Sequence, residues 1–376
     1  MSPPPLRLVI VQSATKKGGV ENLLLTWLPQ MDRTMISPIV VTLGFHRGTL
    51  PDEVRALGVE VQEWNAGRIR RVHRTIWTIL KLAWLGRRAD VFVSYSIHAH
   101  IYARLAALLS RRPCVLVLHI VLSEKSEWDL ATKVAMALGT SLVVANSQTT
   151  ADSVRKAFPG VPIEMIYNSV HPTFLTPVDG GAAVRAKWKI KPDEYVVAMA
   201  ARMHTGKGHA TFIRAAALLK GRAKFLIAGE AVFGWSQDLP VELKDLVRRL
   251  DLQNDVHFVG GCDTMPAFYH ASDIVVVPSE TPESFCLTAA EAMASGIPVV
   301  STRVGALPEI LGLAGVMVPP GDPYALSEAI RQLLDNANAR KTLGQKGRER
   351  VRLFFSPDGM ARMWEKFLSF YSCKFN

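Results

Sequence analysis

The sequence predicts an α/β protein built from two doubly wound parallel-sheet domains. Short apolar runs alternate with longer amphipathic stretches along the chain, and this alternation is typical of parallel strands joined by covering helices. The chain has 376 residues, which is enough for two domains of ordinary size. A proline-bearing segment, His171–Pro177, separates two such blocks and predicts a linker between them.

Both blocks contain apolar runs of strand length with helical patterns between most of them. In the first block the predicted strands are Leu6–Gln12, Ile36–Leu43, Val59–Glu63, Asp90–Val93, Cys114–His119, Ser141–Ala145 and Ile163–Ile166. In the second block they are Tyr195–Ala200, Lys224–Gly229, Val256–Val259, Asp273–Val277, Val299–Ser301 and Gly315–Val318. A last helix is predicted over Asp358–Tyr371. We therefore expect domains at 1–172 and 178–356.

The composition is that of a globular protein, and its charge is uneven. Residues 1–170 hold 20 Lys+Arg against 12 Asp+Glu, within a net charge of +11 for the whole chain. Such an excess favours an acidic partner such as anionic lipid, a phosphorylated acceptor or nucleic acid. The amino terminus lacks the apolar core of a signal peptide, no apolar run has membrane-spanning length, and the cysteines are scattered at 114, 262, 286 and 373. These features predict a protein that is cytosolic or bound to the inner face of a membrane.

Two glutamates, Glu283 and Glu291, stand eight residues apart directly after the predicted strand Asp273–Val277. On one helix this spacing separates side chains by about 80° and roughly 12 Å along the axis, so one long ligand could touch both. Such pairs are usually solvated surface charges, but the flanking alanines predict a mostly buried helix, where carboxylates need a partner or ligand. The backbone N–H groups of the helix start would face an anion; they belong to Phe285, Cys286, Leu287 and Thr288.

Arg202 and Lys207 lie in a glycine-containing loop that follows the first strand of the second block. A basic pair in a strand-to-helix loop suits phosphate oxygens, and a solvated loop is the alternative. A P-loop is excluded because Ala201 and Gly208 occupy positions where it needs glycine and Ser/Thr.

The first block offers weaker candidates. Gly18 and Gly19 follow its first strand and form either an ordinary turn or a close approach to a ligand. His119 ends a strand and is either structural or faces a substrate. His98 and His100 form a His-x-His pair without an evident third metal ligand. No Gly-x-Gly-x-x-Gly follows a strand, which disfavours a nicotinamide or flavin enzyme.

The segment from Glu283 through Glu291 to Ile310 resembles the Glu-x7-Glu motif of the retaining family 4 glycosyltransferases, also called glycosyl transferases group 1. The Arg202-to-Lys207 spacing and the Gly18-Gly19-Val20-Glu21 loop resemble two further elements of that family. The chain departs from the pattern at four glycine positions, which here are Ala201, Ser169, Ser284 and Cys286.

The resemblance implies the GT-B architecture, in which two Rossmann-like domains face each other across a cleft and the last helix, 357–376, packs back on the first. It implies that Arg202 and Lys207 neutralise the diphosphate of a nucleotide sugar. It also implies that Glu283 binds sugar hydroxyls, that Glu291 accepts hydrogen bonds from ribose hydroxyls, and that His119 faces the donor sugar and acceptor. The backbone at Gly18 and Gly19 would face the donor phosphates.

The function expected from this resemblance is a retaining hexosyltransferase that moves a sugar from a nucleotide diphosphate to a hydroxyl of a saccharide or lipid-linked acceptor. We expect no cofactor and no metal, because no Asp-x-Asp occurs in the chain. Cell-envelope polysaccharide or glycolipid synthesis is the expected setting. The alternatives are an epimerase or phosphorylase of the same architecture, a scaffold, or a basic membrane-binding or nucleic-acid-binding protein. Nucleic acid is disfavoured because no aromatic stacking platform accompanies the charge.

Residues 67–88 predict a basic amphipathic helix. Its apolar stripe is Ile69, Val72, Ile76, Ile79, Leu80 and Ala83, with Trp77 and Trp84 one heptad apart and arginines at both ends. Such a helix either packs on the sheet of the first domain or lies on an anionic membrane surface. The second interpretation would favour a lipid-linked acceptor.

Overall fold

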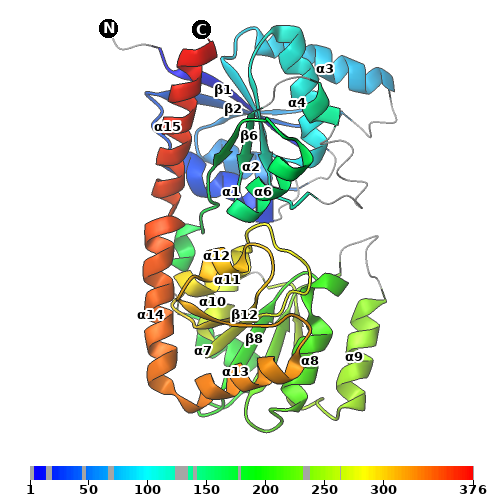
Figure 1. The fold of residues 1–376 in the computed structure, drawn as a ribbon, viewed down its shortest axis with the longest axis vertical. Coiled ribbons are helices and arrows are strands. Elements are labelled where there is room, and N and C mark those ends of the chain that lie inside the picture. The colour runs from blue at the N-terminus through cyan, green and yellow to red at the C-terminus, as the bar shows by residue number, and fades with distance from the viewer. Residues whose placement is uncertain are drawn as a thin grey trace. The chain divides into compact units, whose positions relative to one another are not determined.

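The computed structural model describes residues 4–13, 19–44, 48–66, 72–122, 134–138, 142–176, 179–231, 238–262 and 264–375. The chain divides into two compact units (Figure 1). Unit 1 comprises Met1–Ser169 and Ser356–Asn376, and unit 2 comprises Val170–Phe355.

Unit 1 is built on a parallel sheet with the strand order β3-β2-β1-β4-β5-β6-β7. Its strands are β1 (Leu6–Gln12), β2 (Ile36–Thr42), β3 (Glu60–Glu63), β4 (Val91–Ser94), β5 (Cys114–Leu118), β6 (Leu142–Ala145) and β7 (Ile163–Met165). Consecutive residues Leu8, Val9, Ile10 and Val11 of β1 are all buried. Since neighbouring residues of a strand point to opposite faces, both faces of this sheet are covered.

The helices of unit 1 are α1 (Gly19–Trp27), α2 (Leu50–Ala56), α3 (Val72–Gly86), α4 (Ile97–Ser110), α6 (Gln148–Ala157) and α15 (Pro357–Phe375), with a 3-10 turn at Leu28–Gln30. The C-terminal helix α15 belongs to this unit. Its Trp364 is fully buried and stacks on Trp27 of α1 with ring centroids 5.3 Å apart. Two stacked, buried indoles bring a large apolar area to this contact.

Unit 2 has a parallel sheet of order β10-β9-β8-β11-β12-β13. Its strands are β8 (Val196–Ala200), β9 (Lys224–Ala228), β10 (Val256–Gly260), β11 (Ile274–Val277), β12 (Val299–Thr302) and β13 (Gly315–Val318). Its helices are α7 (Gly181–Lys187), α8 (His209–Ala217), α9 (Leu239–Arg249), α10 (Met265–His270), α11 (Leu287–Ala294), α12 (Leu307–Leu311), α13 (Pro323–Asp335) and α14 (Ala337–Phe354). Short 3-10 turns lie at η2 (Pro172–Phe174) and η3 (Thr205–Lys207).

The prediction of two doubly wound parallel-sheet domains is confirmed, and every described strand pairing is parallel. The predicted linker differs in one respect, because Pro172–Phe174 forms the turn η2 and buries Phe174. Proline presets the helical φ there, and the His171 ring accepts a hydrogen bond from the Thr173 backbone N–H.

Candidate functional site

In unit 2, the strand order places β8 beside β11, although other strands separate them in sequence. The strand order reverses at this point, and open α/β sheets bind ligands at the carboxyl ends of such strands. The loops that leave these two ends are 201–208 and 278–286. The Gly206 carbonyl accepts a hydrogen bond from the Glu280 N–H at 2.8 Å, so the two loops are in direct contact.

Glycine is required for this contact. Gly208 has φ +73, and a Cβ there would lie 1.8 Å from the Pro278 carbonyl oxygen. A Cβ on Gly206 would lie 2.4 Å from the Thr281 Oγ1. No side chain fits at these distances, so both glycines let the basic loop lie against the loop after β11.

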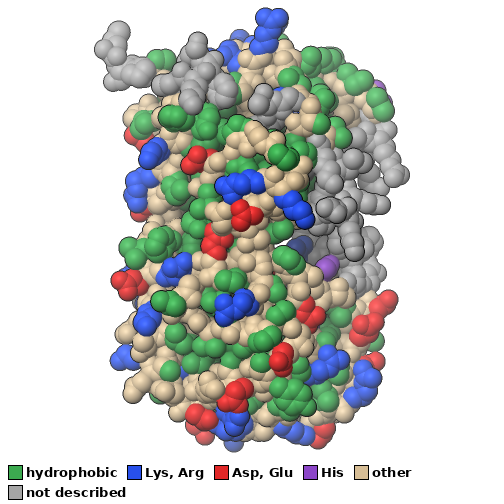
Figure 2. All heavy atoms as spheres, in the orientation of Figure 1, with side chains coloured by type: hydrophobic (Ala, Val, Ile, Leu, Met, Phe, Trp, Pro, Cys, Tyr) green, Lys and Arg blue, Asp and Glu red, His purple; other side chains and the backbone are tan. Residues whose placement is uncertain are grey.

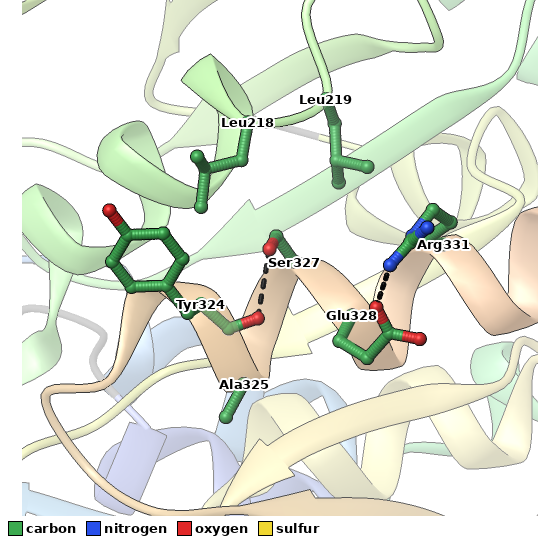
Figure 3. Close-up of a pocket in the computed structure, with 7 residues that line it drawn as sticks. All are labelled: Leu218, Leu219, Tyr324, Ala325, Ser327, Glu328 and Arg331. Atoms are coloured by element: carbon green, nitrogen blue, oxygen red, sulfur yellow. Dashed lines mark hydrogen bonds and ion pairs between the residues drawn. The ribbon is translucent and has the colours of Figure 1, made fainter.

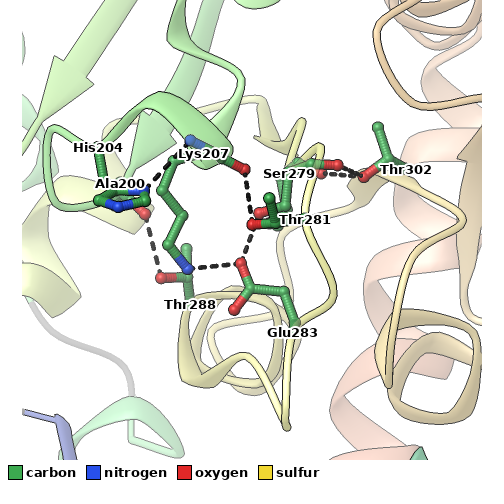
Figure 4. A network of polar contacts seen from close by, with 10 residues as sticks. Ala200, His204, Lys207, Ser279, Thr281, Glu283, Thr288 and Thr302 are labelled. Carbon is green, nitrogen blue, oxygen red and sulfur yellow. Dashed lines mark hydrogen bonds and ion pairs between the residues drawn. The ribbon is translucent and has the colours of Figure 1, made fainter. Parts of the chain in front are cut away.

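Lys207 and Glu283, one from each loop, form a partly buried ion pair (Figure 4). Lys207 Nζ lies 2.6 Å from Glu283 Oε1, and the same oxygen accepts a hydrogen bond of 2.5 Å from the Ser279 Oγ. Only 12% of the Glu283 side chain and 24% of the Lys207 side chain are exposed. Both bonds reach Oε1, so Oε2 faces no partner among the contacts described. The ammonium uses one of its three N–H donors on Glu283.

Ser279 was not predicted from the sequence. Its backbone is fixed by Thr302 at the end of β12, whose Oγ1 donates to the Ser279 carbonyl at 2.6 Å (Figure 4). A Cβ on Gly305 would lie 2.3 Å from the Glu283 N, so the loop after β12 also packs tightly on Glu283. A polar residue just after a buried strand is a usable sequence signal, and Ser279 fits it.

The predicted position of Glu283 on a helix is wrong. Helix α11 begins at Leu287, and its N-cap residue Cys286 has a left-handed φ of 78°. Glu283 therefore lies four residues before the start of the helix, in the loop that leaves β11. Glu291 is in the second turn of α11, and the helical geometry expected between the two glutamates does not apply.

Of the residues expected to bind an anion through their backbone, two use their side chains for packing or bonding. Phe285 is buried and packs edge-on against Phe355, with centroids 5.3 Å apart. Thr288 donates its Oγ1 hydrogen to the Ala200 carbonyl at the end of β8, at 3.1 Å. Cys286 and Leu287 are partly buried. Burial, then the charge of Glu283, raises the pKa of the Cys286 thiol to about 12, so the thiol is protonated at neutral pH.

Glu291 is a carboxyl group with a single described side-chain partner. The hydroxyl of the fully buried Tyr269, on α10, lies 2.9 Å from Glu291 Oε2. Burial raises the pKa of Glu291 from 4.5 to about 7, and the hydrogen bond from Tyr269 opposes this rise. Tyr269 was missed because no motif or spacing distinguishes it from other core aromatics.

Arg202 is exposed in the loop after β8. Burial lowers the pKa of His204, and the charges of Arg202 and Lys207 lower it further. His204 therefore lies near both cations and stays neutral at pH 7. Its Nδ1 accepts a hydrogen bond from the Gly206 N–H at 3.2 Å, which stabilises the turn η3. The described loop is thus positively charged at Arg202 and Lys207, with Glu283 facing it.

In unit 1, Gly18 lies outside the described residues, and Gly19 begins α1. His119 follows β5, is partly buried, and lies 5.3 Å from the Tyr95 ring. Burial lowers its pKa to about 4, so its ring is neutral at pH 7. His100 is fully buried, with its Nδ1 2.8 Å from the Ser94 Oγ. This supports a structural role for His100 in the His-x-His pair.

A hollow in unit 2 lies away from these loops. It is bounded by the residues after α8 and by α13 (Figure 3); its lining includes Leu218, Leu219, Tyr324, Ser327, Glu328 and Arg331. Since α8 begins at the carboxyl end of β8, its far end lies toward the amino ends of the strands. Arg331 and Glu328 in its lining form an ion pair with each other, so each neutralises the charge of the other.

Comparison with known proteins assigns the family. A family model described as Glycosyl transferases group 1 matches residues 182–350, and one described as Glycosyltransferase Family 4 matches residues 17–174. A D-inositol 3-phosphate glycosyltransferase of Saccharomonospora viridis is 29% identical over 330 residues, 82% of this chain and 73% of that protein. One from Salinispora arenicola is 33% identical over 223 residues, 55% of this chain and 50% of that protein.

Among solved structures, Anabaena HepE in complex with UDP has a TM-score of 0.85 at 23% identity, and covers 97% of this chain and 100% of that one. This likeness places the fold among the GT-B glycosyltransferases. Together the two family models match most of both units. The chain belongs to the family 4, group 1 glycosyltransferases.

Proposed function

We propose that this protein transfers a hexosyl group, with retention of anomeric configuration, from a nucleotide diphosphate sugar to a hydroxyl of a saccharide or lipid-linked acceptor. The proposal rests chiefly on the ion pair between Lys207 and Glu283. Glu283 also accepts a hydrogen bond from Ser279. These residues lie where the strand order of unit 2 reverses. Family membership and the basic loop support a donor diphosphate at this place.

Lys207 and Arg202 would stabilise the leaving diphosphate. Its negative charge grows as the glycosidic bond lengthens, so fixed cations lower the energy of the transition state more than that of the bound donor. Lys207 is already held by Glu283 at 2.6 Å, which fixes its position before the donor arrives. Its remaining N–H donors suit phosphate oxygens while the ion pair persists.

Glu283 would bind the sugar. Its Oε1 is occupied by Lys207 and Ser279, which leaves Oε2 to accept a hydrogen bond from a sugar hydroxyl. A charged carboxylate near the anomeric carbon also favours the positive charge of an oxocarbenium-like transition state. Glu291, with Tyr269 on one oxygen, would accept hydrogen bonds from the ribose. The neutral ring of His119 would contribute an uncharged N–H donor or acceptor toward the donor sugar and acceptor.

Further parts of the proposal follow from the family. The departing phosphate oxygen would take the acceptor proton, so no enzymic nucleophile is needed. The two cations of the loop would balance the diphosphate without a metal ion. UDP is the first nucleotide to test, because HepE was solved with it. The inositol phosphate relatives add a phosphorylated polyol to the acceptors worth testing. We propose that the protein acts in the cytoplasm, in polysaccharide or glycolipid synthesis at the inner face of the membrane.

A donor panel tests the proposal. Unfolding temperature is measured with UDP, GDP and ADP sugars, because a ligand that binds only the folded state raises it. Transfer is then assayed with the best donor and a panel of hydroxyl acceptors, with and without EDTA. An epimerase would convert the donor without a glycosylated product.

The decisive variant is Lys207→Ala, with Lys220→Ala as its matched control. Lys220 forms an equally short pair of 2.6 Å with Asp251, but that pair lies on the surface. Loss of transfer in Lys207→Ala, with wild-type transfer in Lys220→Ala, supports the proposal. Wild-type transfer by a folded Lys207→Ala protein would overturn it.

A further inference from the structure

Helix α3 of unit 1 is apolar on two sides. Its inner side packs on α4 and joins the core through Ile79 and Leu82, and Thr75 lies 3.3 Å from the Tyr102 hydroxyl. Gly86 completes this side, since a Cβ there would lie 2.7 Å from the Phe92 ring. The requirement that a covering helix bury one apolar stripe is therefore already met.

The outer side of α3 carries large apolar side chains that are exposed rather than packed in the core. Trp77 is 71% exposed and Trp84 is 62% exposed. Ile76 and Leu80 are exposed beside them, and Val72 is exposed as the first residue of the helix. Seven residues separate the two tryptophans, which places them about 20° apart around the helix. Hydrophobic side chains are visible on the surface where α3 runs (Figure 2). Of the predicted stripe, Ile79 is buried, Val72, Ile76 and Leu80 are exposed, and Ile69 lies outside the described residues.

The sequence of the segment that contains α3 carries charge of one sign. Between Trp64 and Ala89 the sequence contains seven Lys or Arg residues and no Asp or Glu. Arg74, Lys81, Arg87 and Arg88 of this stretch are described and exposed. Arg88 lies over the Trp84 ring, 5.5 Å from its centroid. Tryptophan beside arginine on an exposed apolar face suits the boundary between water and lipid, where one end of each side chain stays solvated.

We propose that the outer side of α3 docks on an anionic lipid bilayer, with Trp77 and Trp84 inserted at the level of the headgroups. The basic residues would add attraction to acidic phospholipid headgroups. A second copy of this chain is disfavoured as the occupant, because a two-fold contact through this face would bring the same arginines together. None of the described helices is long and apolar enough to cross a bilayer, so the contact proposed is interfacial. This inference extends the proposed function, since a lipid-linked acceptor resides in such a surface.

Vesicle binding tests the inference directly. The full chain is sedimented with vesicles of phosphatidylcholine containing one third phosphatidylglycerol, and with vesicles of phosphatidylcholine alone. The variant Trp77→Gln/Trp84→Gln should lower partitioning to the anionic vesicles roughly tenfold or more. Arg87→Gln/Arg88→Gln should lower partitioning to the anionic vesicles by about fivefold per charge removed, and should weaken the salt dependence of that partitioning. The control Tyr324→Gln removes an aromatic side chain of similar exposure from unit 2 and should change nothing.

A second readout uses brominated lipids, which quench the fluorescence of tryptophans inserted in the bilayer. They should quench part of the tryptophan fluorescence of the wild type and much less of that of Trp77→Gln/Trp84→Gln. Thermal stabilisation by the nucleotide sugar is measured on the same proteins. It should be unchanged by the α3 substitutions, so failure of docking and failure of the donor site are distinguishable. Wild-type vesicle binding by the double tryptophan variant would overturn the inference. So would equal binding to neutral vesicles, or a dimer that the tryptophan substitutions dissociate.

Discussion

Replacement of Glu291 by glutamine should abolish a pH dependence of donor binding. Burial raises the pKa of Glu291 from 4.5 to about 7. Ionising this carboxyl in the folded protein therefore costs ~3 kcal/mol more than ionising it in water. The sign follows from linkage: this group favours folding below about pH 4.5, and that contribution is lost as pH rises through 7. Ribose hydroxyls that donate to Glu291 form stronger hydrogen bonds with its ionised form, so the donor should bind better as pH rises.

The size of the effect follows from the ionised fraction. With a pKa of about 7, roughly a tenth of the carboxyl groups are ionised at pH 6 and roughly nine tenths at pH 8. If the donor binds only that form, its apparent affinity rises about tenfold over this range. Glu291→Gln should bind the donor weakly at both pH values, with little change between them.

Isothermal titration calorimetry measures this change. The ligand is the nucleotide sugar selected by the donor panel, because its diphosphate diester does not titrate near neutral pH. Tyr269→Phe provides a second test: the tyrosine hydrogen bond lowers the pKa of Glu291, so its removal should move the rise in affinity to higher pH. A wild-type affinity that falls from pH 6 to pH 8, or a rise retained in Glu291→Gln, would show that ionisation of Glu291 does not control donor binding.

Three further substitutions test how the site is built. Ser279→Ala removes the 2.5 Å bond to Glu283 Oε1. It should raise the activation barrier by ~1 kcal/mol, which lowers kcat about fivefold, with KM little changed. A rise in KM alone in steady-state kinetics would argue against a positioning role. Cys286→Gly removes the strain of a non-glycine residue at φ 78. It should raise the unfolding free energy of unit 2 by ~1 kcal/mol in urea titrations. Any loss of stability would contradict this expectation. Gly208→Ala places a Cβ 1.8 Å from the Pro278 oxygen and should lower the unfolding free energy by more than ~2 kcal/mol. The control Gly221→Ala, with a similar φ of +76 and open space around it, should lower it by only ~1 kcal/mol. Equal losses in the two variants would show that packing against Pro278 does not matter.

The fold could be predicted because its signal is spread along the whole chain. Buried strands such as Ile274–Val277 and Val196–Ala200 are short apolar runs that any parallel sheet requires. The loops after these strands could also be predicted as a site, because ligands gather where adjacent parallel strands end. The pairing of Lys207 with Glu283 could not, since it depends on how two loops 76 residues apart pack together.

The errors had local causes. The alanine-rich sequence that follows Glu283 predicts a helix there. A cysteine gives no sign of the left-handed backbone at position 286, although the family pattern has glycine at that position. Tyr269 reaches Glu291 from another helix, α10, and resembles any buried aromatic until the fold is known. On α3 the apolar spacing predicted one stripe that included Ile76, Ile79 and Leu80, whereas the structure buries Ile79 and exposes Ile76 and Leu80. Periodicity finds an apolar helix, but only packing shows which of its sides is covered.

A crystal structure of the protein with an intact nucleotide sugar tests the proposed donor site most directly. We expect the diphosphate within hydrogen-bond reach of Lys207 Nζ and the Arg202 guanidinium, with a sugar hydroxyl on Glu283 Oε2. A diphosphate held anywhere else, with the Lys207–Glu283 pair untouched, would contradict it.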